Sequence, residues 1–338
     1  MLRFIAKRVG TSAIVLFVVT VIVFVLTRLI PSNPAIIYVG PKAPQAEIDR
    51  VHTLLGFDRP LIEQYFSYLA GLFRGDWGNS LATKRPVLDE FATRLPATLE
   101  LIGAALLFAI VVGVFLGVLA ARRPGKIQDG LIRVLSIGGV SIPAFWLGLL
   151  LQLLFVGRLG WFPATGQFTS SIKFTDPIAT LTGFPLFDSL VTGNWVAYTD
   201  GLHHLVLPAI TLAAYPLGLI ARMTRASMLE VLGQDYVFTA NAYGLRDGLI
   251  RWKLALRNAL PPTLTIVGLA AAYTLTGTFF VEIVFNWPGI GQFATAALLA
   301  VDYPVIMAIT LLGAFGYLLA NVVVDLIQAQ LDPRVRNT

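Results

Sequence analysis

The chain alternates long apolar runs with shorter polar connections. An α-helix needs about 20 consecutive apolar residues to cross the hydrocarbon core of a bilayer. Runs of this kind occupy six ranges, residues 9–30, 97–121, 131–157, 204–222, 262–283 and 304–327. The pattern therefore predicts an all-α membrane protein with six transmembrane helices.

The first run follows Arg3, Lys7 and Arg8, an arrangement that also begins a secretory signal peptide. It extends from Val9 to Ile30, beyond the ~7–15 residues of a signal-peptide apolar region, and no small-residue cleavage site closes it. We expect this segment to be an uncleaved membrane anchor.

Composition supports the same class of protein. Hydrophobic residues make up 56% of the 338 residues and charged residues 13%, with a mean hydropathy of +0.75. A soluble domain carries about 25% charged residues. The chain has no cysteine, which excludes disulfides and thiolate metal sites.

The net charge of +6 could by itself indicate nucleic-acid binding, but the basic residues follow the predicted membrane topology. Short cytoplasmic loops of membrane proteins are enriched in Lys and Arg. With the N-terminus inside, the inner side carries Arg3, Lys7, Arg8, Arg122, Arg123, Lys126, Arg133, Arg222, Arg225, Arg246, Arg251, Lys253, Arg257, Arg334 and Arg336. We therefore expect both termini to be cytoplasmic.

The polar segments divide the chain into parts. Residues 31–96 carry both signs of charge, and their apolar spacing predicts two short amphipathic helices, within 48–55 and 62–73, in a small external cap. The predicted order is the cytoplasmic N-terminus and first transmembrane helix (1–30), the cap (31–96), the transmembrane core (97–328) with a cytoplasmic loop at 223–261, and a cytoplasmic tail (329–338). The segment 167–202 is weakly patterned and indicates no role.

The stretch from Tyr236 to Pro262 predicts a helix, a turn at Gly244 and a second helix. We expect Asp247 to cap the second helix, and Leu260-Pro261-Pro262 to end it. The residues expected on one face of this helix are Leu249, Trp252, Leu256 and Leu260.

Two further segments carry candidate pathway or gate residues. Pro143, followed by Phe145 and Trp146, predicts a kink in the third run, and a kink beside a conducting path and a purely structural kink are equally open. Between the last two runs, Pro288 and Gly289 belong to a Pro-Gly-x-Gly turn that predicts an outer loop dipping back towards the membrane.

Glu282 lies just before that turn, at the outer end of a span, where burial without a partner would be expensive. It is interpreted either as a hydrogen-bonded anchor for the loop or as a contact for the amino group of a peptide in transit. Arg222 and Arg225, where the fourth run ends, are interpreted as side chains that reach lipid phosphates.

Enzymatic chemistry finds no support in the sequence. A phosphate-binding loop needs Gly-x-x-x-x-Gly-Lys-Ser/Thr, and Gly125-Lys126 lacks both the upstream glycine and the following hydroxyl. Neither a carboxylate pair nor a nucleophile–base set appears in the spans. The adjacent His203 and His204 point apart on a helix, so we expect no metal site there. The chain is not expected to hydrolyse ATP by itself.

Several separated motifs resemble the permease subunits of dipeptide/oligopeptide-type ABC importers. The loop that begins at Tyr236 resembles their "EAA" coupling loop, with Phe238 standing where the general motif has Glu. The motifs that carry the resemblance are Gly75–Gly78, Ser141–Gly148, Gly160–Gly166, Arg222–Ser227, Thr239–Leu245, Leu256–Leu260, Val281–Gln292 and Leu331–Arg334. They follow one another in the family's order from the first span to the tail.

The resemblance implies a type I ABC importer permease fold and alternating access driven by ATP in partner subunits. Its implied partners are a second homologous permease subunit, two cytoplasmic ABC ATPase subunits, an external substrate-binding protein and the lipid bilayer, without nucleic acid. It implies no cofactor or metal on this chain, with ATP and Mg held by the ATPases, and a place in the bacterial inner membrane. The implied ATPase contacts are Tyr236, Thr239, Ala240, Ala242, Gly244 and Leu245, with Leu260 and Pro261 transmitting motion to the fifth span.

Relatives in this branch carry dipeptides, longer peptides, glutathione, haem or nickel complexes, so the resemblance implies peptides without fixing the substrate. The alternative is a self-sufficient secondary carrier, which usually has internal repeats and ionisable groups near the midplane. The halves of this chain have no detectable repeat, and its membrane charges cluster at span ends. Asp325 could serve a proton relay in such a carrier, but one helical turn from the inner end of its span we expect it to face a partner or water.

Overall fold

A computed structural model describes residues 2–29, 34–40, 42–54 and 56–331. The tail motif after Leu331 and the first residues of the predicted cap lie outside these ranges. Within them the regular elements are helices, and the only strand-like feature is one bridge between Asn79 and Pro86. The helices are α1 (Leu2–Leu29), α2 (Pro34–Val39), α3 (Gln45–Leu54), α4 (Leu61–Phe73), α5 (Val87–Arg122), α6 (Ile127–Ser141), α7 (Ala144–Leu151), η1 (Gln152–Arg158), α8 (Ile172–Thr175), α9 (Pro185–Val191), α10 (Trp195–Leu232), α11 (Asp235–Ala242), α12 (Asp247–Leu249), η2 (Ile250–Ala255), α13 (Leu256–Val284), α14 (Ile290–Leu299) and α15 (Tyr303–Leu331).

Among the described residues, five helices are long and apolar enough to cross a membrane, and a sixth candidate is a bent pair. This confirms the all-α membrane class. The five are residues 8–29, 87–122, 195–232, 247–284 and 303–323. They extend beyond several predicted runs, because hydropathy marks only the apolar part of a helix that continues into polar surroundings. α5 in particular starts within the range predicted as cap and contains Pro96.

The third predicted run is not one straight helix. α6 and the helix formed by α7 and η1 meet at an angle of 112°. Ile142 has an extended backbone, with ψ 126°. Because the ring of a proline disfavours the helical conformation of the residue before it, Pro143 breaks the run at this position rather than bending it slightly.

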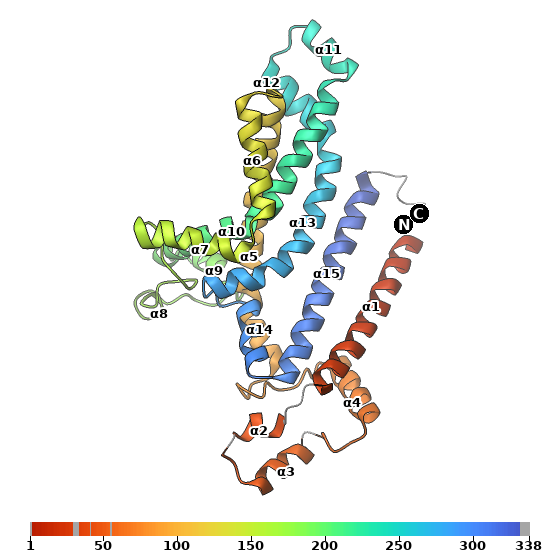
Figure 1. The fold of residues 1–338 in the computed structure, drawn as a ribbon, viewed down its shortest axis with the longest axis vertical. Coiled ribbons are helices and arrows are strands. Elements are labelled where there is room, and N and C mark those ends of the chain that lie inside the picture. The colour runs from red at the N-terminus through yellow and green to blue at the C-terminus, as the bar shows by residue number, and fades with distance from the viewer. Residues whose placement is uncertain (1, 30–33, 41, 55, 332–338) are drawn as a thin grey trace.

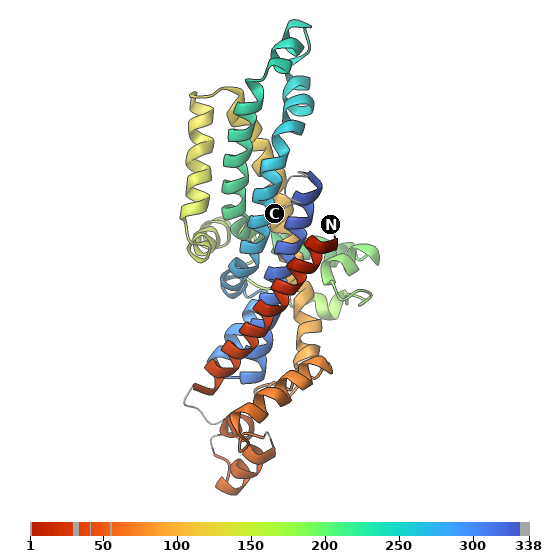
Figure 2. The same cartoon turned by 90° about the vertical axis from the view of Figure 1, so that its right-hand side faces the viewer.

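Figure 1 shows α10 at the centre, with α5, α6 and α13 packed along it. α1 pairs with α15 on one side, and α2–α4 lie at one end, where α4 packs on the end of α1. α11 forms the opposite end, beyond the ends of α1 and α15, as Figure 2 also shows. We call these the cap end and the α11 end.

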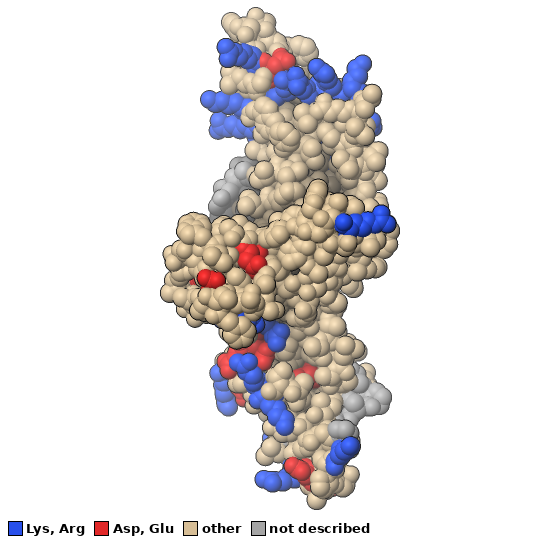
Figure 3. Space-filling model, turned by 90° about the vertical axis from the view of Figure 1, so that its left-hand side faces the viewer, with Lys and Arg blue, Asp and Glu red and all other residues tan. Residues whose placement is uncertain are grey.

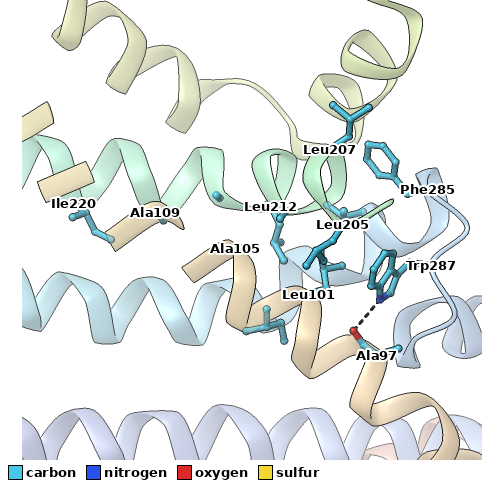
Figure 4. Close-up of a cluster of buried hydrophobic side chains, with 14 residues drawn as sticks. Ala97, Leu101, Ala105, Ala109, Leu205, Leu207, Leu212, Ile220, Phe285 and Trp287 are labelled. Carbon is cyan, nitrogen blue, oxygen red and sulfur yellow. Dashed lines mark hydrogen bonds between the residues drawn. The ribbon is translucent and has the colours of Figure 1, made fainter. Parts of the chain in front are cut away.

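The main core cluster joins α5, α10 and the loop after α13. Figure 4 shows Leu101, Leu205 and Leu212 around Phe285 and Trp287, whose indole Nε1 donates a hydrogen bond to the Ala97 carbonyl at 2.8 Å. This cluster holds the loop after α13 against the middle of the helical core.

Small residues let α5 approach α10 closely. A Cβ at Gly117 would lie 2.5 Å from the Thr224 Cβ, and one at Gly113 would lie 2.9 Å from an Ile220 methyl group. The two glycines form a G-x-x-x-G pattern, which places both on one helix face. Both glycines have ordinary helical backbones, so their role is to leave room for α10 rather than to allow a positive φ.

The segment between η1 and α10 is tied down by two carboxylates. Glu100 on α5 accepts hydrogen bonds from the Leu186 amide at 2.9 Å and the Gln167 side chain at 2.7 Å. Asp188, which is 1% exposed, accepts from the Thr182 hydroxyl at 2.6 Å and from the amides of three successive residues, 181–183. The turn is therefore built around a carboxylate.

Burial alone would raise the pKa of Asp188, but the hydrogen bonds from Thr182, Leu181 and Gly183 bring it below its ordinary value. A depressed folded-state pKa means that the ionised carboxylate stabilises the turn above the unfolded pKa of about 4, and that this stability is lost as pH falls through the folded pKa. We expect the protection of the 181–183 amides from hydrogen exchange, relative to their intrinsic rates at each pH, to fall below about pH 4. In the Asp188→Asn variant, the amides of residues 181–183 should exchange rapidly already at pH 7. Unchanged exchange of these amides in the variant would contradict the prediction.

Candidate functional site

The α11 end holds the predicted helix, turn and helix. α11 is followed by a turn in which Gly244 has a φ of +71°, in the left-handed region that glycine adopts without a Cβ penalty. Val237 and Ala240 of α11 pack on Ile250 of the following helix. This contact fixes the position of α11 relative to the helix that follows the turn.

The predicted contact residues divide between two faces of this loop. Tyr236, Thr239, Ala242, Gly244 and Leu245 are exposed. Ala240 is buried, so it belongs to the face of α11 that packs on Ile250 and does not face outwards. Leu260 is half-buried and Pro261 exposed, on the first turns of α13.

Two exposed aromatic residues were missed by motif reasoning. Phe238 and Tyr243 are 64% and 82% exposed at the tip of the α11 end. Large apolar side chains exposed together are typical of surfaces that bind a partner. We call Phe238, Ala242, Tyr243 and Leu245 the tip surface. The apolar character of Phe238 in a cytoplasmic loop was the available signal.

Two local predictions for the second helix are wrong. Pro261 and Pro262 do not end a helix, because residues 247–284 form one continuous helix that includes both. The carbonyls of Arg257 and Asn258, which lose their helical donors to these prolines, belong to exposed residues and can bind water.

Asp247 is not the cap. It is the first residue of α12 and accepts a hydrogen bond from Arg251 at 3.3 Å. Ile250, Ala255 and Ala259 form the buried side of this helix, whereas Leu249 and Trp252 are 42% and 44% exposed, and the Trp252 ring stacks on Phe115 of α5. The π-helical turn η2 (Ile250–Ala255) lies within this helix.

Basic side chains surround the α11 end. Figure 3 shows Lys and Arg outnumbering Asp and Glu at this end, whereas the two signs of charge are mixed towards the cap end. The exposed basic residues of the loop include Arg246, Lys253 and Arg257. The tip surface is thus an apolar patch with a positively charged rim.

Below this end, Arg225 of α10 does not reach out to lipid, contrary to the sequence interpretation. Its Nε and Nη2 donate to the two carboxyl oxygens of Asp129 at 2.6 and 2.8 Å. Asp129 on α6 is 1% exposed and also accepts from the Gly125 amide at 2.9 Å. Arg222, in contrast, is exposed. A bidentate ion pair therefore joins α6 to α10.

The break between α6 and α7 brings the first group of predicted pathway residues to the surface of the core. Pro143 lines a cavity of about 310 Å³ between α6, α7, α10 and α13. Phe145 and Trp146 are 44% and 48% exposed, and the Phe145 ring lies 6.2 Å from that of Phe280. The broken helix thus faces α13 across a hollow.

The second group is organised by Glu282, which is fully buried. Its Oε1 accepts from the Thr98 hydroxyl at 2.6 Å, and its Oε2 accepts from the Gly291 and Gln292 amides at 2.6 and 3.2 Å. Both oxygens are therefore used to hold the loop that follows α13, which is the geometry of an anchor.

Gly289 passes directly over that carboxyl group, and a Cβ there would lie 2.2 Å from Oε1 of Glu282. Pro288 lines a different cavity, of about 630 Å³, beside Asn286, Gln292 and the 166–188 segment. The structure thus separates the predicted pathway residues into two places, the helix break and the anchored loop.

The histidines have partners within the chain. His203 Nε2 lies 2.7 Å from the Trp161 carbonyl, and His204 Nδ1 lies 2.9 Å from the Asp200 carbonyl. Among the described residues, no group of three or more His, Cys, Asp or Glu side chains could hold a metal ion.

These features define a class: a multi-pass helical membrane protein with a broken span, a buried anchor loop and an exposed helix–turn–helix at one end. Residues 113–337 match the family described as binding-protein-dependent transport system inner membrane component, and residues 1–102 match the family of the N-terminal part of such membrane components. The chain belongs to this family, and it is a multi-pass inner membrane permease of the class predicted from its motifs.

Similar proteins agree along the whole chain. The probable D,D-dipeptide transport system permease protein of Escherichia coli (strain K12) is 43% identical over 94% of this chain and 92% of its own length. The di/tripeptide transport system permease protein of Pseudomonas aeruginosa (strain UCBPP-PA14) is 43% identical over 100% and 99%. The glutathione transport system permease protein of Escherichia coli (strain K12) is 35% identical over 99% of both chains. None of these relatives supports the secondary-carrier alternative.

Proposed function

We propose that this chain is the permease subunit of an ATP-driven ABC importer that moves di- or oligopeptides delivered by an external substrate-binding protein. The observation that carries the proposal is the α11 end, where an apolar tip surface with a basic rim projects beyond α1 and α15. A chain that bound no partner there would expose Phe238 and Tyr243 to water at a cost.

In this proposal the α11 end is cytoplasmic and docks on one of two ABC ATPase subunits, which hold ATP and Mg and carry out the hydrolysis. The chain itself is not catalytic. The basic rim supports this orientation, because Lys and Arg favour the cytoplasmic side. Both termini are then cytoplasmic as well, since α1 begins and α15 ends on the α11 side of the molecule.

Closure of the ATPases draws the α11 helices of this chain and of a second homologous permease subunit together. The continuous helix from Asp247 to Val284 makes a direct lever for this motion, because it joins the loop after Gly244 to the anchored loop at Glu282. The helix end that the sequence predicted at Leu260-Pro261 would have interrupted such a lever.

The peptide substrate is supported by the names of relatives that are 43% identical over nearly the full chain. The permease that is 35% identical is named for the transport of glutathione, which is itself a tripeptide. We assign the choice between dipeptides and longer peptides to the binding protein rather than to this chain.

Gly244 provides the sharpest test of the coupling role. A Cβ there would meet nothing within 4 Å, so a substitution costs only backbone strain at positive φ and leaves the spans unaffected. Gly244→Val should reduce ATP-driven peptide uptake at least tenfold, while the ATPases of the assembled complex keep hydrolysing ATP. The strain is of the order of 1–3 kcal/mol, enough to displace α11.

Two matched variants control this experiment. Gly244→Asn should keep most of the uptake, because Asn tolerates the left-handed region. Gly248→Ala, four residues away with no positive φ and open space around it, should be silent. Normal uptake with Gly244→Val would remove the basis for this coupling role.

Partner composition can be measured directly. The chain, expressed with its native neighbours and purified through a tag in mild detergent, should bring two ATPase subunits and a second permease, identified by mass spectrometry. Purification alone, with transport driven by an ion gradient, would instead favour a secondary carrier.

A further inference from the structure

The cavity at the helix break has an unusual wall. It is about 310 Å³ in volume and lies where α6, α7, α10 and α13 meet. Ser141, Tyr215 and Tyr273 contribute hydroxyl groups, and none of the residues that line it is charged. A volume of this order is sufficient for a small ligand.

The hydroxyl groups of this wall are of two kinds. Thr211 and Thr274, which also line the cavity, donate to carbonyls of their own helices at 2.8 and 2.6 Å. In contrast, the hydroxyls of Ser141, Tyr215 and Tyr273 have no hydrogen-bond partner in the part of the chain that the structure describes. The two tyrosine rings are neighbours, with centroids 5.9 Å apart and planes tilted by 60°.

These groups do not suit a surface that faces lipid. Tyr273 is 59% exposed although it lies within a transmembrane helix. A hydroxyl without a partner in hydrocarbon is unfavourable, and so is the non-helical backbone at Ile142-Pro143. Irregular backbone at membrane depth is tolerated only inside protein or along a water-filled cavity. The hollow must therefore face one of these two.

We propose that this hollow is a contact site for the main chain of the peptide during transport, with Tyr215, Tyr273 and Ser141 hydrogen-bonding its amide and carboxyl groups. The inference rests on the proposed function and extends it to named residues. Neutral hydroxyls bind main-chain groups that every peptide has, and an uncharged wall neither attracts nor repels acidic and basic side chains. The site therefore accepts peptides of different sequence.

Uptake measurements test the contact. In vesicles that contain the complete transporter, Tyr215→Phe and Tyr273→Phe keep the rings and remove only the hydroxyls. Each should lower ATP-driven uptake of dialanine about 2- to 10-fold, the effect of one neutral hydrogen bond, and the double variant should lower it more. Tyr317→Phe is the matched control, because Tyr317 is an exposed tyrosine of α15 that does not line this cavity. An unchanged double variant would overturn the proposal.

The absence of cysteine allows a second readout. A single cysteine introduced by Tyr273→Cys should react with a water-soluble maleimide, with or without trapping by ATP and vanadate, and dialanine supplied with the binding protein should slow the reaction. Failure to react in either state would mean that lipid or the second permease covers the hollow, which contradicts the proposal.

Co-purification of the second permease must persist in Tyr215→Phe/Tyr273→Phe, since its loss would make the hollow a subunit interface. If the unmodified complex moves no peptide at all, the proposed function itself fails.

Discussion

Arg225→Met is expected to be among the most destabilising single changes in this chain, costing about 3–5 kcal/mol. The substitution leaves the Asp129 carboxyl group, which is fully shielded from solvent, with only the Gly125 amide at 2.9 Å and the Arg133 guanidinium at 3.6 Å. A buried charge that has lost its main partner pays its desolvation cost without compensation. The measurement is the midpoint of thermal unfolding in mild detergent.

The ion pair should respond asymmetrically. Asp129→Asn leaves Arg225 unpaired, but the Arg225 side chain is 22% exposed and its long stem can carry the guanidinium towards water. We therefore expect Asp129→Asn to cost less than Arg225→Met. The double variant should be more stable than Arg225→Met alone, because it no longer buries an unpaired charge.

Arg222→Met is the matched control, an exposed arginine on the same helix three residues earlier. It should change the midpoint little. Equal losses in Arg222→Met and Arg225→Met would show that the Asp129–Arg225 pair does not join α6 to α10 in the way the distances indicate.

Gly289→Ala is expected to have an effect of similar size at the cap side of the core. Its Cβ would lie 2.2–2.4 Å from all three carboxyl atoms of Glu282. The Glu282 carboxyl group has no room to withdraw without losing its bonds to Thr98, Gly291 and Gln292. A buried donor left without its partner costs about 1–3 kcal/mol, so losing two of these hydrogen bonds costs several kcal/mol.

A double-variant cycle separates this clash from a general effect on the loop. In the Glu282→Ala background the carboxyl group is absent, so Gly289→Ala should add little further destabilisation. Gly103→Ala, at a helical glycine with open space around it, is the control and should be neutral or slightly stabilising. Additive losses in the double variant would contradict the assignment of Glu282 as the group that fixes the loop.

Much of the architecture follows from local sequence. The apolar runs predict the membrane helices because the signal for each helix, its apolar composition, lies entirely within consecutive residues of that helix. The turn at Gly244 and the helices before and after it are equally local, since positive φ selects glycine and the apolar spacing predicts helices. The permease class was likewise predicted from short sequence motifs, through their resemblance to a known family.

Other features depend on residues that meet only in the folded chain. Arg225 lies 96 residues from Asp129, and Glu282 lies 184 residues from Thr98, so no window reveals either contact. Whether a charged residue at a span end reaches lipid or a buried partner is decided by which helices pack together. The same holds for Ala240 of α11, whose burial depends on contact with Ile250 of the following helix.

The broken third span shows most clearly which features follow from local sequence and which depend on tertiary packing. The sequence determined that Pro143 disturbs the helix, because a proline restricts the residue before it. Only the tertiary structure decided the size of the bend, 112°, and what it opens towards. α10 and α13 supply the tyrosines and the space for the hollow, and their positions are set by packing against α5 rather than by the residues around Pro143.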